Sequence, residues 1–549
     1  MRLRRLVVAL AAAIAGVVPA ADLGRSQPSP DQDALIRAAC SVPTRLLART
    51  LRGHREDRAS EIQLLPQAPA FIGHGGLPHS GPWDFVTEVP MLWYGPGFIR
   101  SRGASDRPVS LADVAPTQAE LLGFHLPDAE GAALEEILVP RAERSEPPRL
   151  IVTLVWDAAG GNVLREWPDA WPNLRGLIPQ GAWFGRANIG SSPPSTAQIH
   201  ATIGTGVFPR THGITAHRMR VGGGPLVTPW KPGPNLLLRP TLADLYDRAR
   251  RNRPLVGTIG SGPVHLGMMS HGAMWGGGDR DVAALRVDQS AETLGAEAHR
   301  WQLDPTTAPW YRHLEYLNDL PPLSDYLPEV DRSDGRSDGR WHGHTMEELD
   351  EGAYSPARVP FQTRAVREVI EREGFGVDEV TDLLFLNYKL LDEIGHRFSM
   401  NGVEMRDSLL AQDADLPRLI RLLDETVGRG RWVMVLTADH GHTPDPAVTG
   451  HFMISPVKVG GAVLDRFDRD GDDRRLVDKT LPTQLFIDTA ELRDNGHTLE
   501  EVSAFVLSLT KARVAAEGIA YAPSEARDRV FAAVLPSAML DELPCLRDG

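Results

Sequence analysis

Three strongly apolar segments, each followed by polar residues, constrain the fold of this chain most. They span residues 149–156, 380–388 and 432–437. Apolar strands separated by helical stretches are typical of a parallel sheet that is covered by helices on both faces. We therefore predict an α/β fold, a three-layer sandwich around a mostly parallel sheet with insertion or cap segments. Ligands of such sheets bind beyond the carboxyl ends of the strands.

The charge of the chain limits its partners. The 549 residues carry a formal net charge of −14. A nucleic-acid-binding protein normally presents a basic surface, so we expect no nucleic-acid-binding surface here. The negative charge does not exclude small anionic ligands, because bound cations can reverse the potential at a site.

The first residues are typical of an export signal. Arg2, Arg4 and Arg5 precede the apolar run 6–18, and small residues follow at 19–21. We predict a signal peptide over 1–21, with an uncleaved anchor as the alternative, and no transmembrane segment beyond it. The protein is then periplasmic or secreted, in an oxidising environment where Cys40 and Cys545 can pair, although the sequence does not establish that they do.

Carboxylates and imidazoles follow the apolar segments. Asp157 directly follows the first, Asp392-Glu-Ile-Gly-His396 lies beyond the second, and Asp439-His440-Gly441 follows the third. Carboxylate oxygen and imidazole nitrogen are ligands that suit zinc and related divalent ions. Three such groups at three strand ends predict a metal site.

These motifs resemble the alkaline phosphatase superfamily, particularly its nucleotide pyrophosphatase/phosphodiesterase branch. That branch has an Asp after the first strand, a Thr nucleophile, and the motifs D-x-x-G-H and D-H-G. Residues 200–214, HATIGTGVFPRTHGI, resemble the branch's segment H-x-x-x-x-T-G-x-x-P-x-x-H-G-I. This anchor implies that Thr196 is the nucleophile, with Ser195 as the alternative. The resemblance also implies an alkaline phosphatase-like fold.

The resemblance implies two divalent metal ions, zinc in the first instance, with manganese or calcium as alternatives. Bound cations activate a hydroxyl nucleophile and neutralise charge on phosphoryl oxygens. One ion is expected at Asp157, Thr196, Asp439 and His440. The other is expected at Asp392 and His396, together with a third histidine.

That third histidine should follow the D-H-G motif, just before a strand of the type V-P-L-I-x-Y-G. Such a strand occurs instead near the N-terminus, where residues 79–97 resemble the family segment and helix 110–123 follows. We interpret this order as a circular permutation that makes His79 the third ligand. The alternative interpretation is that the resemblance of 79–97 arises by chance and that His79 lies in a surface loop. His74, His442 and His451 are the alternative candidates for this third ligand.

The permutation suggests a domain plan. We expect an extension over 22–60, the permuted C-terminal part of the catalytic domain over 61–127, and a linker over 128–148. The main catalytic domain spans 149–449 with a cap or insertion over about 216–379, and 450–549 belongs to the same domain.

The sequence departs from the branch at one position. The branch places Asn three residues after its H-G-I motif, where it contacts a phosphoryl oxygen, and this chain has His217 there. A histidine can still donate a hydrogen bond, so we predict a catalytic role for it. The resemblance implies an exported, metal-dependent phosphoesterase acting on small phosphorylated substrates: diesters, pyrophosphates or monoesters. A phosphonate hydrolase or phosphate-transferring enzyme, and a non-catalytic exported binding protein, are the alternatives.

Overall fold

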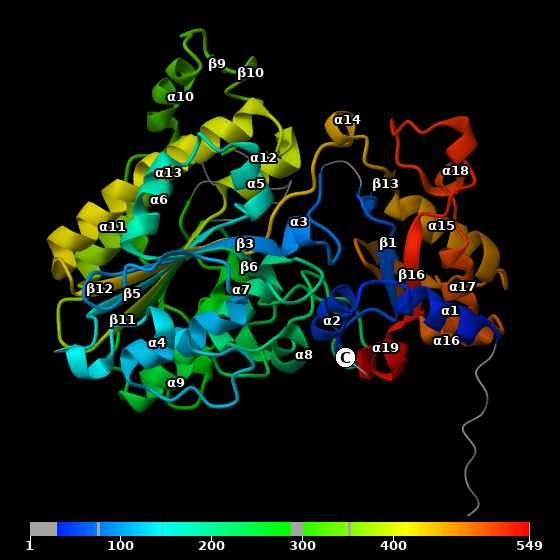
Figure 1. Ribbon diagram of the computed structural model, residues 1–549, viewed down its shortest axis with the longest axis horizontal. Helices are drawn as coiled ribbons and strands as arrows, with labels where there is room; N and C mark the ends of the chain where they lie inside the picture. Colours follow the sequence, from blue (N-terminus) through cyan, green and yellow to red (C-terminus); the bar gives the residue numbers. More distant parts are fainter. Residues whose placement is uncertain (1–29, 74–76, 145, 287–299, 350–352, 548–549) are drawn as a thin grey trace, which may run out of the picture.

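A computed structural model describes residues 30–73, 77–144, 146–286, 300–349, 353–547 of the chain. The segment predicted as a signal peptide lies outside these residues, as does His74. The chain builds two regions, one around a large sheet and one around a small sheet (Figure 1).

The large sheet has eight strands in the order β4-β6-β3-β12-β5-β11-β7-β8. The three apolar segments predicted as strands form its centre as β12, β5 and β11, which are parallel and adjacent. The bounds are β3 Glu88–Tyr94, β4 Gly103–Ser105, β5 Leu150–Trp156, β6 Ala182–Asn188, β7 Val256–Gly260, β8 Val282–Leu285, β11 Asp382–Tyr388 and β12 Trp432–Thr437.

Helices cover both faces of this sheet (Figure 1). On one face lie α5 (Gly161–Glu166), α6 (Pro172–Leu177), α11 (Arg358–Glu373), α12 (Leu390–Phe398) and α13 (Val403–Leu423), and on the other α4 (Val114–Leu122), α7 (Thr196–Thr205) and α9 (Leu242–Ala249). The predicted α/β sandwich around a mostly parallel sheet is thereby confirmed. Helix α4 ends where expected, because Gly123 adopts a left-handed conformation with φ 59°.

Strand β3 runs against its neighbours. It pairs antiparallel with both β12 and β6, whereas the other pairs of the sheet are parallel. The start of β3 therefore lies at the edge where β5, β6, β11 and β12 end. Residues that precede β3 in the sequence are delivered to this edge.

The second region joins the two ends of the described chain. Its sheet has the order β14-β15-β1-β16, with β1 (Ile62–Pro66) between strands from the C-terminal part, β14 (Val477–Leu481), β15 (Gln484–Ile487) and β16 (Phe531–Pro536). Its apolar core is separate from that of the large sheet. A disulfide links Cys40, at the end of α1 (Pro30–Cys40), to Cys545 in α19 (Pro544–Arg547), with 5.7 Å between their Cα atoms.

This architecture differs from the expected domain plan in two places. Residues 450–549 build a sheet of their own with β1, and the expected insertion 216–379 contributes β7 and β8 to the large sheet. Both strands are short and bordered by Gly, Pro and Asp, so the sequence gives them a weak pattern.

Shorter elements complete the two regions. Their bounds are α2 Thr44–Gly53, α3 Asp84–Thr87, α8 Pro209–His212, α10 Leu327–Ser333, α14 Pro446–Thr449, α15 Pro456–Phe467, α16 Thr489–Asp494, α17 Leu499–Leu507, α18 Lys511–Val514, β2 Phe71–Ile72, β9 Arg340–Trp341, β10 His344–Thr345 and β13 Met453–Ile454. In the part of the chain that the structure describes, no helix has the length and apolar character to cross a membrane.

Candidate metal centre

Residues from five strands meet at one edge of the large sheet. Four strands deliver them at their carboxyl ends, and the antiparallel β3 delivers one before its start. They are Asp157 after β5, Thr196 after β6, Asp392 and His396 on α12 after β11, Asp439 and His440 after β12, and His79 before β3. Figure 1 shows the strands from which they come.

One oxygen of Asp392 is surrounded by imidazole nitrogens. Its Oδ1 atom lies 3.4 Å from Nε2 of His79, 3.3 Å from Nε2 of His396 and 3.9 Å from Nε2 of His440. Asp392 Oδ1 and His440 Nε2 are both buried and have no hydrogen-bond partner. Buried polar atoms are almost always paired, so this group is suited to a bound cation.

The same three histidines are oriented by their other ring nitrogen. Each Nδ1 lies within hydrogen-bond distance of a backbone carbonyl, at 2.5 Å for His79, 2.8 Å for His396 and 3.1 Å for His440. The acceptors belong to Pro194, Leu77 and Gly441, respectively. An imidazole that donates through Nδ1 presents Nε2 as a free electron pair, which is the usual arrangement of a metal-binding histidine.

His442 is buried beside this group but is oriented differently. Its Nε2 lies 3.6 Å from Asp392 Oδ1, but it is closer, at 3.1 Å, to the backbone carbonyl oxygen of Asp392, within hydrogen-bond distance. Its ring also explains the glycine of the D-x-x-G-H motif, because a Cβ on Gly395 would lie 2.2 Å from His442 Nε2. His442 thus packs against helix α12, which carries Asp392. His451 is half-buried and lies outside the clustered groups.

A second group of ligand atoms adjoins the first. Oxygen and nitrogen atoms of Asp157, Asp439 and His440 lie within 4.8 Å of one another. His440 Nε2 is 3.4 Å from Asp439 Oδ2 and 3.7 Å from Asp157 Oδ1. Asp439 Oδ2 is also buried without a hydrogen-bond partner. Two adjacent sets of ligand atoms fit two cations, and the residues present therefore suit the implied metal pair.

Thr196 is the first residue of α7, and Ser195 is its N-cap. The side chain of Thr196 is buried, and its Oγ1 lies 3.1 Å from Lys389 Nζ. Amide groups at a helix N-terminus favour anions, so a phosphoryl group beside Thr196 would meet N–H donors as well.

Lys389 is a site residue that the sequence analysis missed. Its Nζ donates to Asp157 Oδ1 at 3.0 Å, to Asp392 Oδ2 at 2.7 Å and to Thr196 Oγ1 at 3.1 Å. Burial lowers the pKa of this ammonium, but the charges of Asp157 and Asp392 outweigh burial and raise it above its ordinary value. The sequence signal for Lys389 is its position as the polar residue directly after the apolar strand β11.

Burial and neighbouring negative charges oppose ionisation of the carboxylates in this site. Burial and then the charge of Asp439 raise the pKa of Asp157 well above its ordinary value. Burial acts in the same direction on Asp392, but the charges of Lys389 and His396 hold its pKa well below the ordinary range. Buried like charges this close repel one another unless cations lie between them.

His217, predicted as a catalytic residue, is exposed in a loop after α8, in contrast to the buried cluster. Its role stays a prediction.

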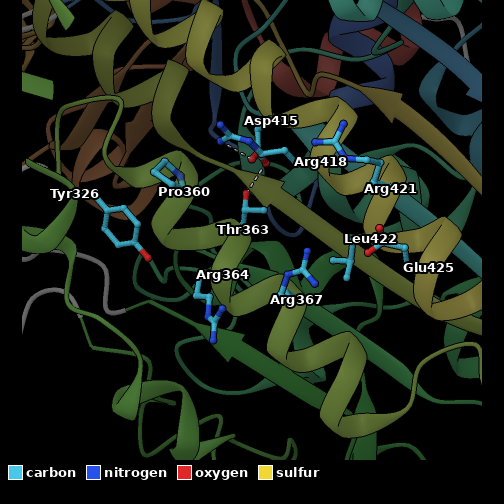
Figure 2. Close-up of a pocket in the computed structure, with 10 residues that line it drawn as sticks. All are labelled: Tyr326, Pro360, Thr363, Arg364, Arg367, Asp415, Arg418, Arg421, Leu422 and Glu425. Carbon is cyan, nitrogen blue, oxygen red and sulfur yellow. Dashed lines mark hydrogen bonds and ion pairs between the residues drawn. The ribbon is translucent and has the colours of Figure 1, made fainter. Parts of the chain in front are cut away.

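Two of the cavities in the described part of the chain differ in how they lie relative to the cluster. One, of about 680 Å³, is bordered by His396 and lined by Pro78, Tyr354, Arg397, Lys479 and Leu481, among others. The other lies between α11 and α13 and is lined by four arginines, whose guanidinium groups point in different directions (Figure 2). Three of these arginines already pair with carboxylates, each within its own helix. Of these two, the first adjoins the candidate metal centre.

The sequence of this chain is similar to those of known proteins. The sequence model of the type I phosphodiesterase / nucleotide pyrophosphatase family matches residues 151–531. The chain therefore belongs to this family, and the predicted family is confirmed.

Individual relatives match over shorter stretches. Alkaline phosphatase PafA of Elizabethkingia meningoseptica is 30% identical over 150 residues, covering 26% of this chain and 27% of that protein. Alkaline phosphatase PhoV of Synechococcus elongatus is 24% identical over 365 residues, covering 59% and 64%. The crystal structure of wild-type PafA superposes with a TM-score of 0.48 and 18% identity, covering 72% of this chain and 85% of that one. The sequence matches thus span between about a quarter and just under two thirds of these relatives' lengths.

Proposed function

We propose that this protein is an exported, metal-dependent phosphoesterase that hydrolyses small phosphate esters. One observation carries the proposal: the buried, unpaired Asp392 Oδ1 is surrounded by Nε2 atoms of His79, His396 and His440. This arrangement is costly in a protein without a cation there and useful in one that binds it. Family membership supports phosphate esters as the substrate class.

Two sets of residues would hold the two divalent cations. We assign Asp157, Thr196, Asp439 and His440 to one, and Asp392, His396 and His79 to the other. When bound, such cations lower the pKa of a hydroxyl and neutralise charge on phosphoryl oxygens. Zinc is the first expectation from this nitrogen- and oxygen-rich ligand set.

Thr196 is the proposed nucleophile. Its Oγ1 forms a bond to phosphorus while the bond from phosphorus to the ester oxygen breaks, and water then cleaves the phosphothreonine to release phosphate. Lys389 Nζ donates to Oγ1, which stabilises negative charge on that oxygen. The cavity beside His396 is the space in which we expect the leaving group.

The charge of Lys389 also indicates which class of phosphate ester is preferred. The carboxylates of Asp157, Asp392 and Asp439 carry three negative charges and an ionised Thr196 a fourth, which together balance two divalent cations. Lys389 adds a further positive charge to this balance. A phosphomonoester dianion gains more from that charge than a diester monoanion does. We infer that monoesters are preferred.

The third ligand and the order of the chain belong to the same proposal. We infer that 61–127 is a permuted C-terminal part of the catalytic domain. The contacts of His79, the position of β3 between β12 and β6, and a family match that begins after this segment support that inference.

The decisive experiment compares substrates and metals together. Purified protein is assayed with aryl phosphate, aryl phosphate diester, aryl sulfate and phosphonoacetate after exhaustive chelation and after addition of zinc, manganese or calcium. We expect metal-restored hydrolysis of aryl phosphate above that of the diester. Undiminished activity at measured zero metal content rejects the metal centre, and faster hydrolysis of phosphonoacetate favours a phosphonate hydrolase. Failure of every substrate in metal-loaded protein favours a binding protein.

A further inference from the structure

A second group of carboxylates lies at the opposite edge of the large sheet. Asp244 and Asp247 belong to α9, and Asp279 and Asp281 precede β8. Because β8 is parallel to β7, its start lies at the edge away from the candidate metal centre. One oxygen each of Asp247, Asp279 and Asp281 lies within 4.8 Å of the others.

These carboxylates differ in whether a hydrogen-bond donor or a basic side chain pairs with them. Asp244 accepts hydrogen bonds from the backbone N–H of Thr241 and from the backbone and Nδ1 of His271, so it is paired. Among the residues described by the structure, no Lys, Arg or His side chain forms an ion pair with Asp247, Asp279 or Asp281. Even Arg280, which lies between two of them in the sequence, donates to backbone carbonyls instead.

Two buried oxygens in this region have no hydrogen-bond partner. Asp247 is 5% exposed, and its Oδ1 has no hydrogen-bond partner. The hydroxyl of Tyr311, whose side chain is 0% exposed, also has none. Burial and then the charges of Asp244 and Asp281 raise the pKa of Tyr311 well above its ordinary value. Unpaired buried oxygens of this kind call for a cation or an ordered water.

We propose that Asp247, Asp279 and Asp281 bind a calcium ion. The donors are all hard oxygens, which suit calcium, whereas zinc favours nitrogen and sulfur. Asp247 is buried, Asp281 half-buried and Asp279 exposed, so the group is open to solvent on one side.

The ion has a structural role. It joins α9 to the start of the edge strand β8 and to the segment at Tyr311, where the backbone N–H of Arg312 already donates to the carbonyl of Asp281. It also removes the repulsion among the carboxylates. This site shares no residue with the proposed catalytic centre and does not depend on the proposed function.

The test is a calcium titration of the full chain with zinc present throughout. We expect calcium to raise Tm by about 2–5 °C at saturation, as for a ligand that binds only the folded state. Terbium should bind the same site and be displaced by calcium. Asp281→Asn and the more exposed Asp279→Asn should both lose the calcium-dependent rise in Tm.

Two controls separate this site from others. Asp470→Asn alters another acidic group, Asp468, Asp470 and Glu491, and should keep the calcium effect. Asp157→Asn alters the catalytic centre and should keep it too. The proposal is overturned if calcium leaves the Tm of the unaltered protein unchanged, if Asp281→Asn keeps the shift, or if only Asp157→Asn abolishes it. A different outcome would also overturn the proposal. If Asp281→Asn has a higher Tm than the parent without calcium, and calcium does not change the Tm of the parent, the carboxylates repel one another and bind no ion.

Discussion

The two sheets of this protein differ in what their edges carry. The eight-stranded sheet ends in buried carboxylates and imidazoles, several of them without hydrogen-bond partners. The four-stranded sheet is surrounded by apolar residues, including Ile62, Leu64, Val502 and Val534, and its region is closed by a disulfide. The large sheet thus carries buried polar groups that lower stability at the proposed catalytic centre. The small region carries apolar contacts and a disulfide, which raise stability.

The comparison also shows how the regions depend on each other. The N-terminal segment first contributes β1 to the small sheet and then passes His79 and β3 to the large one. Helix α2 lies so close to the loop before Thr196 that a Cβ on Gly53 would meet the carbonyl oxygen of Ser192 at 1.7 Å. Changes in the two regions should nevertheless have different effects.

The largest expected effect is on catalysis. Thr196→Ala removes the proposed attacking oxygen and should lower kcat by about 10³-fold or more. Tm should change little, which thermal unfolding checks. Ser195→Ala is the matched control and should retain most activity. An inactive Ser195→Ala beside an active Thr196→Ala would move the nucleophile by one residue.

Removal of a proposed ligand comes next. His79→Ala should weaken one of the two metal sites by at least about 10–100-fold and leave the other occupied, because only one set of ligands includes His79. Metal content per chain after dialysis measures this directly. His451→Ala serves as the control. Two metals per chain retained in His79→Ala would argue against the permuted assignment.

A smaller effect is expected at Lys389. Lys389→Met should lower kcat/KM for an aryl phosphate by about 10–100-fold, the size of a charged hydrogen bond, and lower that for a diester less. The ratio of the two values is the informative quantity. Equal losses for both substrates, accompanied by loss of metal, would mean that Lys389 only holds Asp157 and Asp392 in place.

The smallest effect on activity should come from the other region. Cys40→Ser with Cys545→Ser opens the link between the chain ends and should lower stability by about 2–5 kcal/mol. Denaturant unfolding measures the loss, and kcat at low temperature should stay near that of the parent. A large fall in kcat in folded protein would show that the small region controls the catalytic one.

The sequence determined the centre of the fold because burial on both faces leaves a continuous apolar pattern. The segments that become β5, β11 and β12 carry that pattern, and Asp157, Asp392, Asp439 and His440 lie within the first four residues after them. Strands β7 and β8 are too short for such a signal, and the small sheet pairs β1 with strands more than four hundred residues away, for which no local pattern exists.

Tertiary structure alone decided which side chains meet. The resemblance singled out His79, but only the antiparallel direction of β3 brings it to the edge where Asp392 and His396 lie. His442 has the same residue type and its Nε2 lies 3.6 Å from Asp392 Oδ1, yet that nitrogen is closer to a backbone carbonyl oxygen. Lys389 carried no motif at all and contacts Asp157, Asp392 and Thr196. Residue types and their spacing are local properties of the sequence, whereas the direction of a ring nitrogen or an ammonium group depends on packing among distant segments.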